Sequence, residues 1–237
     1  CLFVKKSVEL IIRSLECFED SDAPIYTTAF SPSYTLRWFM RDREEDLLQF
    51  IEEDPEALAI ALKSIANSLI EFNRVLIKET DVEGFYYCVN NQNNFFEDTL
   101  FNTYVAPYEK EVLKKVNELS NINILHICGY DGLPNDLELF KDFDAAAYNW
   151  DVAAEGVSLA QGKKLFGGKT VIGGFEQDQV IYTGTREEVE KATFDILDEC
   201  GQIGTIIGAG CTLPTDIEEF RLEWVRQASI KYAVENL

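Results

Sequence analysis

Short, almost wholly apolar runs recur along the chain, and stretches with helical spacing separate them. The apolar runs predict six strands, at 25–30, 84–91, 123–129, 145–152, 170–175 and 205–210. Strands that are covered on both faces lose the alternation of apolar and polar residues that half-exposed strands show. Six such strands, regularly interleaved with helices, indicate an α/β fold with a parallel sheet and crossover helices.

The segments between these runs carry apolar residues three and four positions apart, which is typical of helices with one buried face. In the long segment 44–79, Asp54 and Pro55 have the residue types of a helix cap and a first helical position, so two helices are expected there. Thr215 and Glu218 have capping-box spacing and predict the start of the last helix. The other helices are expected at 4–18, 97–119, 133–141, 155–166, 185–200 and 215–235.

Polar side chains follow all six predicted strands. In a β/α barrel the active site is built at the carboxyl ends of the strands, whereas an open sheet concentrates its functional residues at one switch point. A (β/α)8 TIM barrel is therefore favoured, as a single domain over 1–237. Six strands are two fewer than eight and the chain starts inside a helical pattern, so we expect the first two strands to be lacking. The polar residues concerned are Ser31, Asn90 to Gln92, His126, Cys128, Asn149, Asp151, Glu176 to Asp178 and Cys211.

Composition narrows the class of protein. Of the 237 residues, 46% are hydrophobic, which is enough for a sizeable core, and 42 acidic residues against 21 basic ones give a net charge of -21. Such a charge repels nucleic acid and anionic membrane surfaces. No apolar stretch reaches the length of a membrane span, and no secretory signal is visible. Six scattered cysteines are expected to be thiols in a reducing compartment, so we expect a cytoplasmic protein.

The only histidine lies two residues from a cysteine. On a strand His126 and Cys128 point to the same side, and Cys211 follows a later strand. One imidazole and two thiolates form a suitable three-ligand set for zinc, with a fourth position left for substrate or water. The alternative is structural, because a buried cysteine is often only a small apolar side chain.

Four motifs on successive strands resemble the uroporphyrinogen decarboxylase superfamily: HICG at 126–129, NWDV at 149–152, GGFEQD at 173–178 and GAGCTLPTD at 208–216. The His-x-Cys pair and the later Cys are similar to the branch of zinc-dependent corrinoid and coenzyme M methyltransferases. The resemblance implies that His126, Cys128 and Cys211 bind Zn²⁺. It also implies that a thiol, activated as a zinc thiolate, exchanges a methyl group with a corrinoid such as methylcobalamin.

Five more residues are candidates for this site. Asp151 and Glu176 each follow a strand and are predicted to act in catalysis by orienting the substrate, although ordinary loop carboxylates would look the same. Asn90, Gln92 and Tyr148 are weaker candidates for contacts with the cofactor. The predicted partners are a small thiol substrate and a corrinoid protein. A homodimer would cover the open edge of an incomplete barrel.

Two other functions remain open from the sequence. The resemblance implies that a uroporphyrinogen decarboxylase-type lyase would need no metal and would rely on arginines and an aspartate near its chain start, a region that we expect to be lacking in this sequence. An inactive barrel with a binding role is the second alternative. The sequence names neither the thiol nor the methyl donor.

Overall fold

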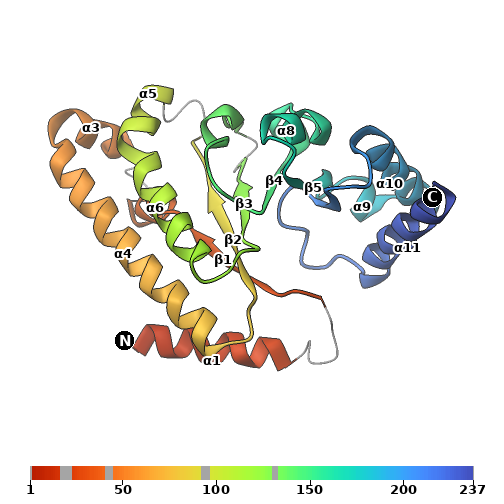
Figure 1. Cartoon of the computed structure of the whole chain (residues 1–237), viewed down its shortest axis with the longest axis horizontal. Helices are drawn as coiled ribbons and strands as arrows, with labels where there is room; N and C mark the ends of the chain where they lie inside the picture. Colours follow the sequence, from red (N-terminus) through yellow and green to blue (C-terminus); the bar gives the residue numbers. More distant parts are fainter. Residues whose placement is uncertain (1, 17–22, 41–44, 92–96, 130–132, 237) are drawn as a thin grey trace. The chain divides into compact units, whose positions relative to one another are not determined.

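The computed structural model describes residues 2–16, 23–40, 45–91, 97–129 and 133–236 (Figure 1). The chain divides into two compact units. Unit 1 comprises 1–89, 96–125 and 143–146, and unit 2 comprises 90–95, 126–142 and 147–237. The prediction of a single domain over 1–237 stays a prediction.

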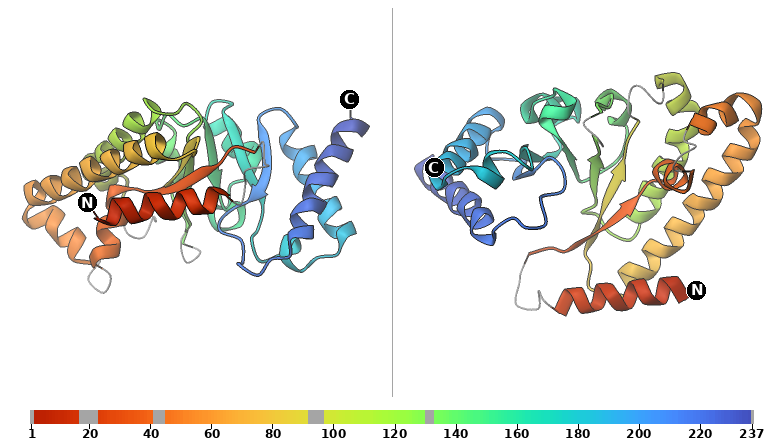
Figure 2. Two further views of the ribbon diagram at one scale, coloured as in Figure 1. Left: turned by 90° about the horizontal axis from the view of Figure 1, so that it is seen from below. Right: turned by 180° about the vertical axis from the view of Figure 1, so that it is seen from behind.

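Unit 1 contains strands β1 (Tyr26–Phe30) and β2 (Gly84–Val89) and the first half of β3 (Ile124–Ile127). β1 and β2 pair in parallel, with Tyr26 opposite Gly84. Helices α4 and α6 lie side by side and pack together (Figures 1 and 2). The helices of this unit are α1 (Leu2–Leu15), α2 (Pro32–Met40), α3 (Glu45–Glu53), α4 (Pro55–Glu79), α5 (Asp98–Leu100), a π-helical turn (Phe101–Val105) and α6 (Ala106–Asn117).

Unit 2 contains the second half of β3, then β4 (Ala147–Trp150), β5 (Thr170–Phe175) and β6 (Thr205–Ala209), in that order. The pairs β4–β5 and β5–β6 are parallel, with Asn149 opposite Ile172. All six predicted strands are present, so the expected α/β fold is confirmed. The helices of this unit are a 3₁₀ turn (Leu137–Phe140), α7 (Val152–Glu155), α8 (Leu159–Leu165), α9 (Val180–Thr183), α10 (Arg186–Cys200) and α11 (Glu219–Glu235).

The predicted split of the segment 44–79 into two helices is confirmed. The Asp54 side chain accepts a hydrogen bond from the Ala57 amide at 3.0 Å and caps α4. Helix α2 was not predicted, although the same signal was present. The Ser31 hydroxyl accepts from the Tyr34 amide, and Pro32 takes the first helical position.

Three helix predictions were wrong in detail. The helix expected over 133–141 is only a 3₁₀ turn at Leu137–Phe140. The single helix expected over 155–166 is interrupted, because Gly156 adopts a left-handed φ of 63° that ends α7, and Ser158 then caps α8. The capping box expected from Thr215 does not form. The last helix begins only at Glu219 and has no side-chain hydrogen bond at its cap.

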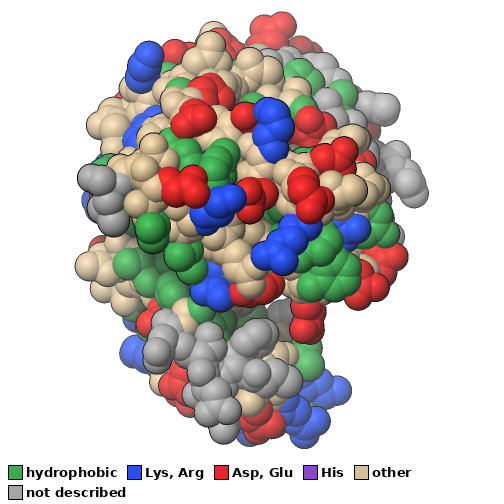
Figure 3. Space-filling model, turned by 90° about the vertical axis from the view of Figure 1, so that its right-hand side faces the viewer, with side chains coloured by type: hydrophobic (Ala, Val, Ile, Leu, Met, Phe, Trp, Pro, Cys, Tyr) green, Lys and Arg blue, Asp and Glu red, His purple; other side chains and the backbone are tan. Residues whose placement is uncertain are grey.

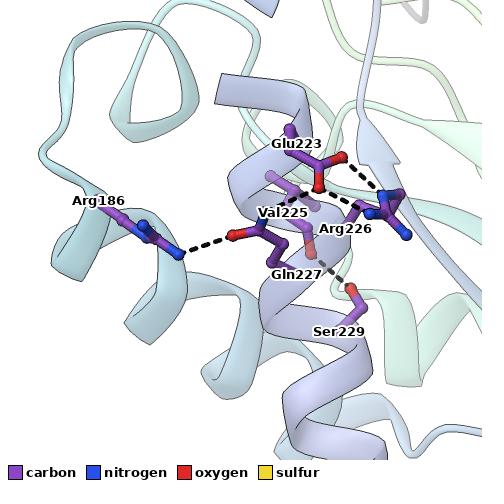
Figure 4. A network of polar contacts seen from close by, with 6 residues as sticks. All are labelled: Arg186, Glu223, Val225, Arg226, Gln227 and Ser229. Carbon is purple, nitrogen blue, oxygen red and sulfur yellow. Dashed lines mark hydrogen bonds and ion pairs between the residues drawn. The ribbon is translucent and has the colours of Figure 1, made fainter. Parts of the chain in front are cut away.

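Helices α10 and α11 cover part of the core of unit 2, and they run side by side in every ribbon view (Figures 1 and 2). The buried residues of this part of the core are Val189 of α10, Val225 of α11, Phe175 and Ile181. A surface network joins the two helices (Figure 4): Arg186 donates to Gln227 at 2.7 Å, and Gln227 donates to Glu223 at 2.8 Å. The apolar contacts hold this helix pair, since exposed polar networks contribute little.

Acidic and basic side chains are interleaved with apolar ones on the face drawn in Figure 3. Several large apolar side chains of unit 2 are exposed, among them Ile206 of β6 and Phe220 and Val234 of α11. Among the helices that the structure describes, none is both long enough and apolar enough to cross a bilayer.

Replacing Gly162 with alanine is expected to destabilise the protein. Gly162 lies in α8 against the fully buried indole of Trp150, and an added Cβ would overlap that ring. The added Cβ would lie far inside van der Waals distance of the Trp150 ring, so we take the upper end of the overpacking cost, about 3 kcal/mol. The better helix propensity of alanine returns about 1 kcal/mol, and we expect a net loss of about 2 kcal/mol in urea unfolding. Lys164→Ala, on the exposed side of the same helix, should stay within about 0.5 kcal/mol of the wild type. Equal stability of both variants would contradict the packing.

Candidate metal centre

Unit 2 brings His126, Cys128 and Cys211 together, although Cys211 is far away in sequence. His126 lies in β3, Cys128 follows the end of that strand, and Cys211 follows β6. Their ligand atoms all lie within 4.8 Å of one another. His126 is 3% exposed, whereas both cysteines are partly buried, so the cluster is accessible from its cysteine side. That these residues bind a metal stays a prediction.

A glycine allows Cys211 to come this close. Gly210 donates its amide to the Phe175 carbonyl at 2.8 Å. A Cβ at Gly210 would lie 2.6 Å from the Asp151 Cα, which is closer than real side chains come. The segment that leaves β6 can therefore pass the end of β4 only with glycine at this position.

The His126 ring is held by an amide side chain. Its Nδ1 lies 2.6 Å from the Asn149 Oδ1, and its Nε2 lies 3.8 Å from the Cys211 Sγ. Asn149 is 1% exposed and lies in β4, next to the strand that carries His126. One ring nitrogen is thus occupied by a hydrogen bond while the other faces the cysteines.

Cys128 and His126 change the ionisation of Cys211. Hydrogen bonds with Cys128 and then with His126 lower the pKa of the Cys211 thiol from 9.0 to about 3, against the opposing effect of burial. The thiolate is the form that binds soft metals and attacks electrophiles. The surroundings of Cys211 therefore favour the charged form that a metal ligand needs.

Two residues that the sequence reasoning did not identify support the backbone at Cys128. The Asn135 side chain donates to the Cys128 carbonyl at 3.1 Å and to the Glu155 carboxylate at 2.7 Å. Asn135 also accepts from the Asn91 amide at 2.8 Å. Burial raises the pKa of Glu155, and the two hydrogen bonds from Asn135 oppose this shift. No local pattern marks these residues, because their partners lie in other parts of the chain.

The other predicted site residues lie in varied surroundings. Asp151 is 8% exposed and caps α7 by accepting from the Ala153 and Ala154 amides, whereas Glu176 is exposed after β5. Asn90 is buried after β2. Tyr148 is buried and stacks on the Phe166 ring, with 4.0 Å between the ring centres. Gln92 lies outside the described residues. The catalytic and cofactor-binding roles of all five stay predictions.

The separation of His126 and Cys211 fits a zinc ion. Nitrogen and sulfur ligands at roughly 2.0 and 2.3 Å from a tetrahedral ion lie roughly 3.6 Å apart. The separation of 3.8 Å between His126 Nε2 and Cys211 Sγ is close to this value. One imidazole and two thiolates are also the donor set that selects zinc over hard cations such as magnesium.

Three comparisons with known proteins bear on the family and the fold of this chain. The family model described as uroporphyrinogen decarboxylase (URO-D) matches residues 1–232. A curated protein, the methylcobamide:CoM methyltransferase MtbA of Methanosarcina mazei, is 28% identical over 111 residues, which are 47% of this chain and 30% of that protein. A solved structure of a methyltransferase from Methanosarcina mazei matches with a TM-score of 0.78 at 15% identity, over 95% of this chain and 64% of that one. The structural likeness establishes the fold alone.

Proposed function

Because the chain belongs to the uroporphyrinogen decarboxylase family, we propose that it acts as a methyltransferase that moves a methyl group between a corrinoid and a thiol. The observation that carries this proposal is the cluster of one imidazole and two thiols within 4.8 Å. The name of the curated relative, which includes both a methylcobamide and CoM, supports the choice of substrates. The chain spans 30% of that relative, so the activity belongs to the proposal.

In this proposal His126, Cys128 and Cys211 hold Zn²⁺. Three protein ligands leave one position of a tetrahedral zinc ion for a thiol, and a bound zinc lowers the pKa of that thiol so that it ionises at neutral pH. The protein contributes an oriented His126 ring and a Cys211 thiol whose own pKa is already low. Asp151 and Glu176 remain the candidates that orient the substrate from the ends of β4 and β5.

The transfer itself balances without a further reactant. The thiolate sulfur of the substrate forms a bond to the methyl carbon, the cobalt–carbon bond breaks, and its electron pair stays on cobalt. The thiol proton passes to solvent. A corrinoid protein is the proposed carrier of the methyl group, and homodimer formation stays a prediction.

The test is a methyl-transfer assay with the purified, zinc-loaded chain. We expect methylcobalamin and 2-mercaptoethanesulfonate to give the methyl thioether together with the absorbance change of demethylated cobalamin. The hydroxyl analogue of the thiol should give no product, because an alcohol keeps its proton at neutral pH. Release of carbon dioxide from a porphyrinogen, with no thioether from any thiol, would favour the decarboxylase instead.

A further inference from the structure

We infer that Asn149 is a positioning residue that fixes His126 in one tautomer and holds its Nε2 toward Cys211. The inference rests on the proposed function only where it concerns metal affinity, since the tautomer is a property of the metal-free chain. Asn149 lies outside the predicted ligand set, and it joins the strands that carry the ligands.

The orientation of the Asn149 amide follows from its partners. Its Nδ2 donates to the Ile172 carbonyl at 2.9 Å and to the Ala209 carbonyl at 3.0 Å. Carbonyl oxygens only accept hydrogen bonds, so the amide nitrogen has to face both of them. Flipping the amide would place its oxygen against two other oxygens in a buried site. The Oδ1 atom therefore faces His126.

This orientation determines the position of the proton on the imidazole. The Asn149 Oδ1 can only accept, and it lies 2.6 Å from the His126 Nδ1. The Nδ1 atom must therefore carry a proton. In the neutral ring Nε2 then has the lone pair and lies 3.8 Å from the Cys211 Sγ, whereas a charged ring would donate its second proton from Nε2 to the thiolate. A metal-binding histidine needs such a lone pair, and the bond made by its other nitrogen fixes it.

The same amide also holds the strand that leads to Cys211. Ala209 is the last residue of β6 and lies two positions before Cys211. The acceptor in β5 is Ile172, which is followed by Gly173 and Gly174 with φ angles of 144° and 109°. Residues other than glycine rarely adopt these φ angles. The strand therefore departs from regular geometry directly after Ile172, whose carbonyl accepts from the Asn149 side chain. Asn149 thus connects β3, β5 and β6 from β4.

A purely structural role can be separated from this one, because unit 1 contains a matched residue. Asn123 is also fully buried, and its side chain accepts from the Phe85 amide at 2.9 Å. Its Nδ2 donates to the Asn117 side chain and the Ser120 carbonyl. Asn123→Ala therefore removes the same number of hydrogen bonds as Asn149→Ala but leaves His126 untouched.

The test uses the fact that His126 is the only histidine in the chain. The protein is labelled with ¹⁵N-histidine, freed of metal and recorded over a pH series, and the tautomer is taken from the spectra in which only one ring nitrogen is protonated. We expect the wild type and Asn123→Ala to show a protonated Nδ1 and an unprotonated Nε2. In Asn149→Ala both nitrogens should move toward intermediate shifts that report a mixture of tautomers.

Metal titration gives the second measurement. Loss of a side chain that orients a metal ligand typically weakens binding by about 10- to 100-fold, which we expect for Asn149→Ala but not for Asn123→Ala. A neutral wild-type ring with its proton on Nε2, or an unchanged tautomer in Asn149→Ala, would overturn the inference. If Asn149→Ala does not fold, the wild-type spectrum still decides. A tautomer that depends on Asn149 in a chain that binds no zinc would leave this inference standing and refute the metal site.

Discussion

Replacing Cys211 with serine is expected to remove most of the zinc that the wild-type chain binds. Structural zinc sites with four ligands are worth about 10–16 kcal/mol, so one ligand accounts for roughly 3–4 kcal/mol, or a loss of about 10²- to 10³-fold in affinity. A serine hydroxyl keeps the size of the side chain but stays protonated at neutral pH. Metal analysis after equilibration with a competing chelator should give about one zinc per wild-type chain and almost none for the variant.

The matched control is Cys200→Ser. Cys200 is another cysteine of unit 2, it is 9% exposed, and its sulfur accepts a hydrogen bond from the Thr205 hydroxyl at 3.2 Å. It lies at the end of α10 and is not part of the cluster. This variant should keep the full zinc content. Equal zinc content in the two variants would mean that the metal is not held by Cys211, and a wild type that stays metal-free after reconstitution would contradict the site altogether.

The strands could be predicted from the sequence because each is a short apolar run, and the packing of a parallel sheet demands such runs. The helix boundaries were harder. The interruption of the helix expected over 155–166 depends on the left-handed conformation of Gly156. The sequence does not show which glycines of a chain adopt this conformation and which do not. Ser31 and Pro32 have the residue types that begin a helix, but the same pair also fits the end of a strand, so α2 was not predicted.

The cluster of His126 and the two cysteines could be predicted for a physical reason. Cys128 and Cys211 are 211 − 128 = 83 residues apart in sequence, yet both follow strands of a parallel arrangement whose carboxyl ends lie on one side. The residues that support the cluster could not be predicted in the same way. Asn135 and Asn149 act through contacts with main-chain carbonyls, and the sequence does not show which carbonyls lie nearby.

The face to which a strand residue points also escaped prediction. Tyr148 is a candidate for a cofactor contact by sequence, and its ring packs on Phe166; the cofactor role stays a prediction. In a strand covered on both faces, apolar residues occupy both sides, so the pattern does not distinguish the interior of a barrel from the layer beneath the helices.

A buried carboxyl group in unit 1 leads to the second large effect. Glu109 lies in α6, is fully buried, and accepts a hydrogen bond from the Ser33 hydroxyl. Burial raises the pKa of Glu109 from 4.5 to about 7, although hydrogen bonds from Ser33 and Ser31 and the charge of Arg37 act in the opposite direction. The folded protein therefore holds this proton more tightly than the unfolded chain does.

Glu109→Gln is expected to gain stability relative to the wild type as the pH rises. The raised pKa stabilises the wild type fully below pH 4.5, and this contribution is lost between pH 4.5 and about 7, because the unfolded chain releases the proton first. The loss amounts to about 3 kcal/mol for a shift of this size. Glutamine resembles the protonated acid and does not titrate, so the difference in unfolding free energy between the variant and the wild type should move by about 3 kcal/mol in favour of the variant.

Urea unfolding of both proteins at a series of pH values from about 4.5 to 8 measures this difference. The titration of the other carboxylates affects both proteins equally and therefore cancels in the difference. Glu111→Gln is the control, since Glu111 lies on the same helix but forms a partly exposed ion pair with Lys63. Its difference from the wild type should stay within about 1 kcal/mol at every pH. A Glu109→Gln difference that does not change with pH would mean that the carboxyl group has water or a cation beside it in the folded protein. The complete burial of the Glu109 carboxyl group, with Ser33 as its hydrogen-bond donor, would then be wrong.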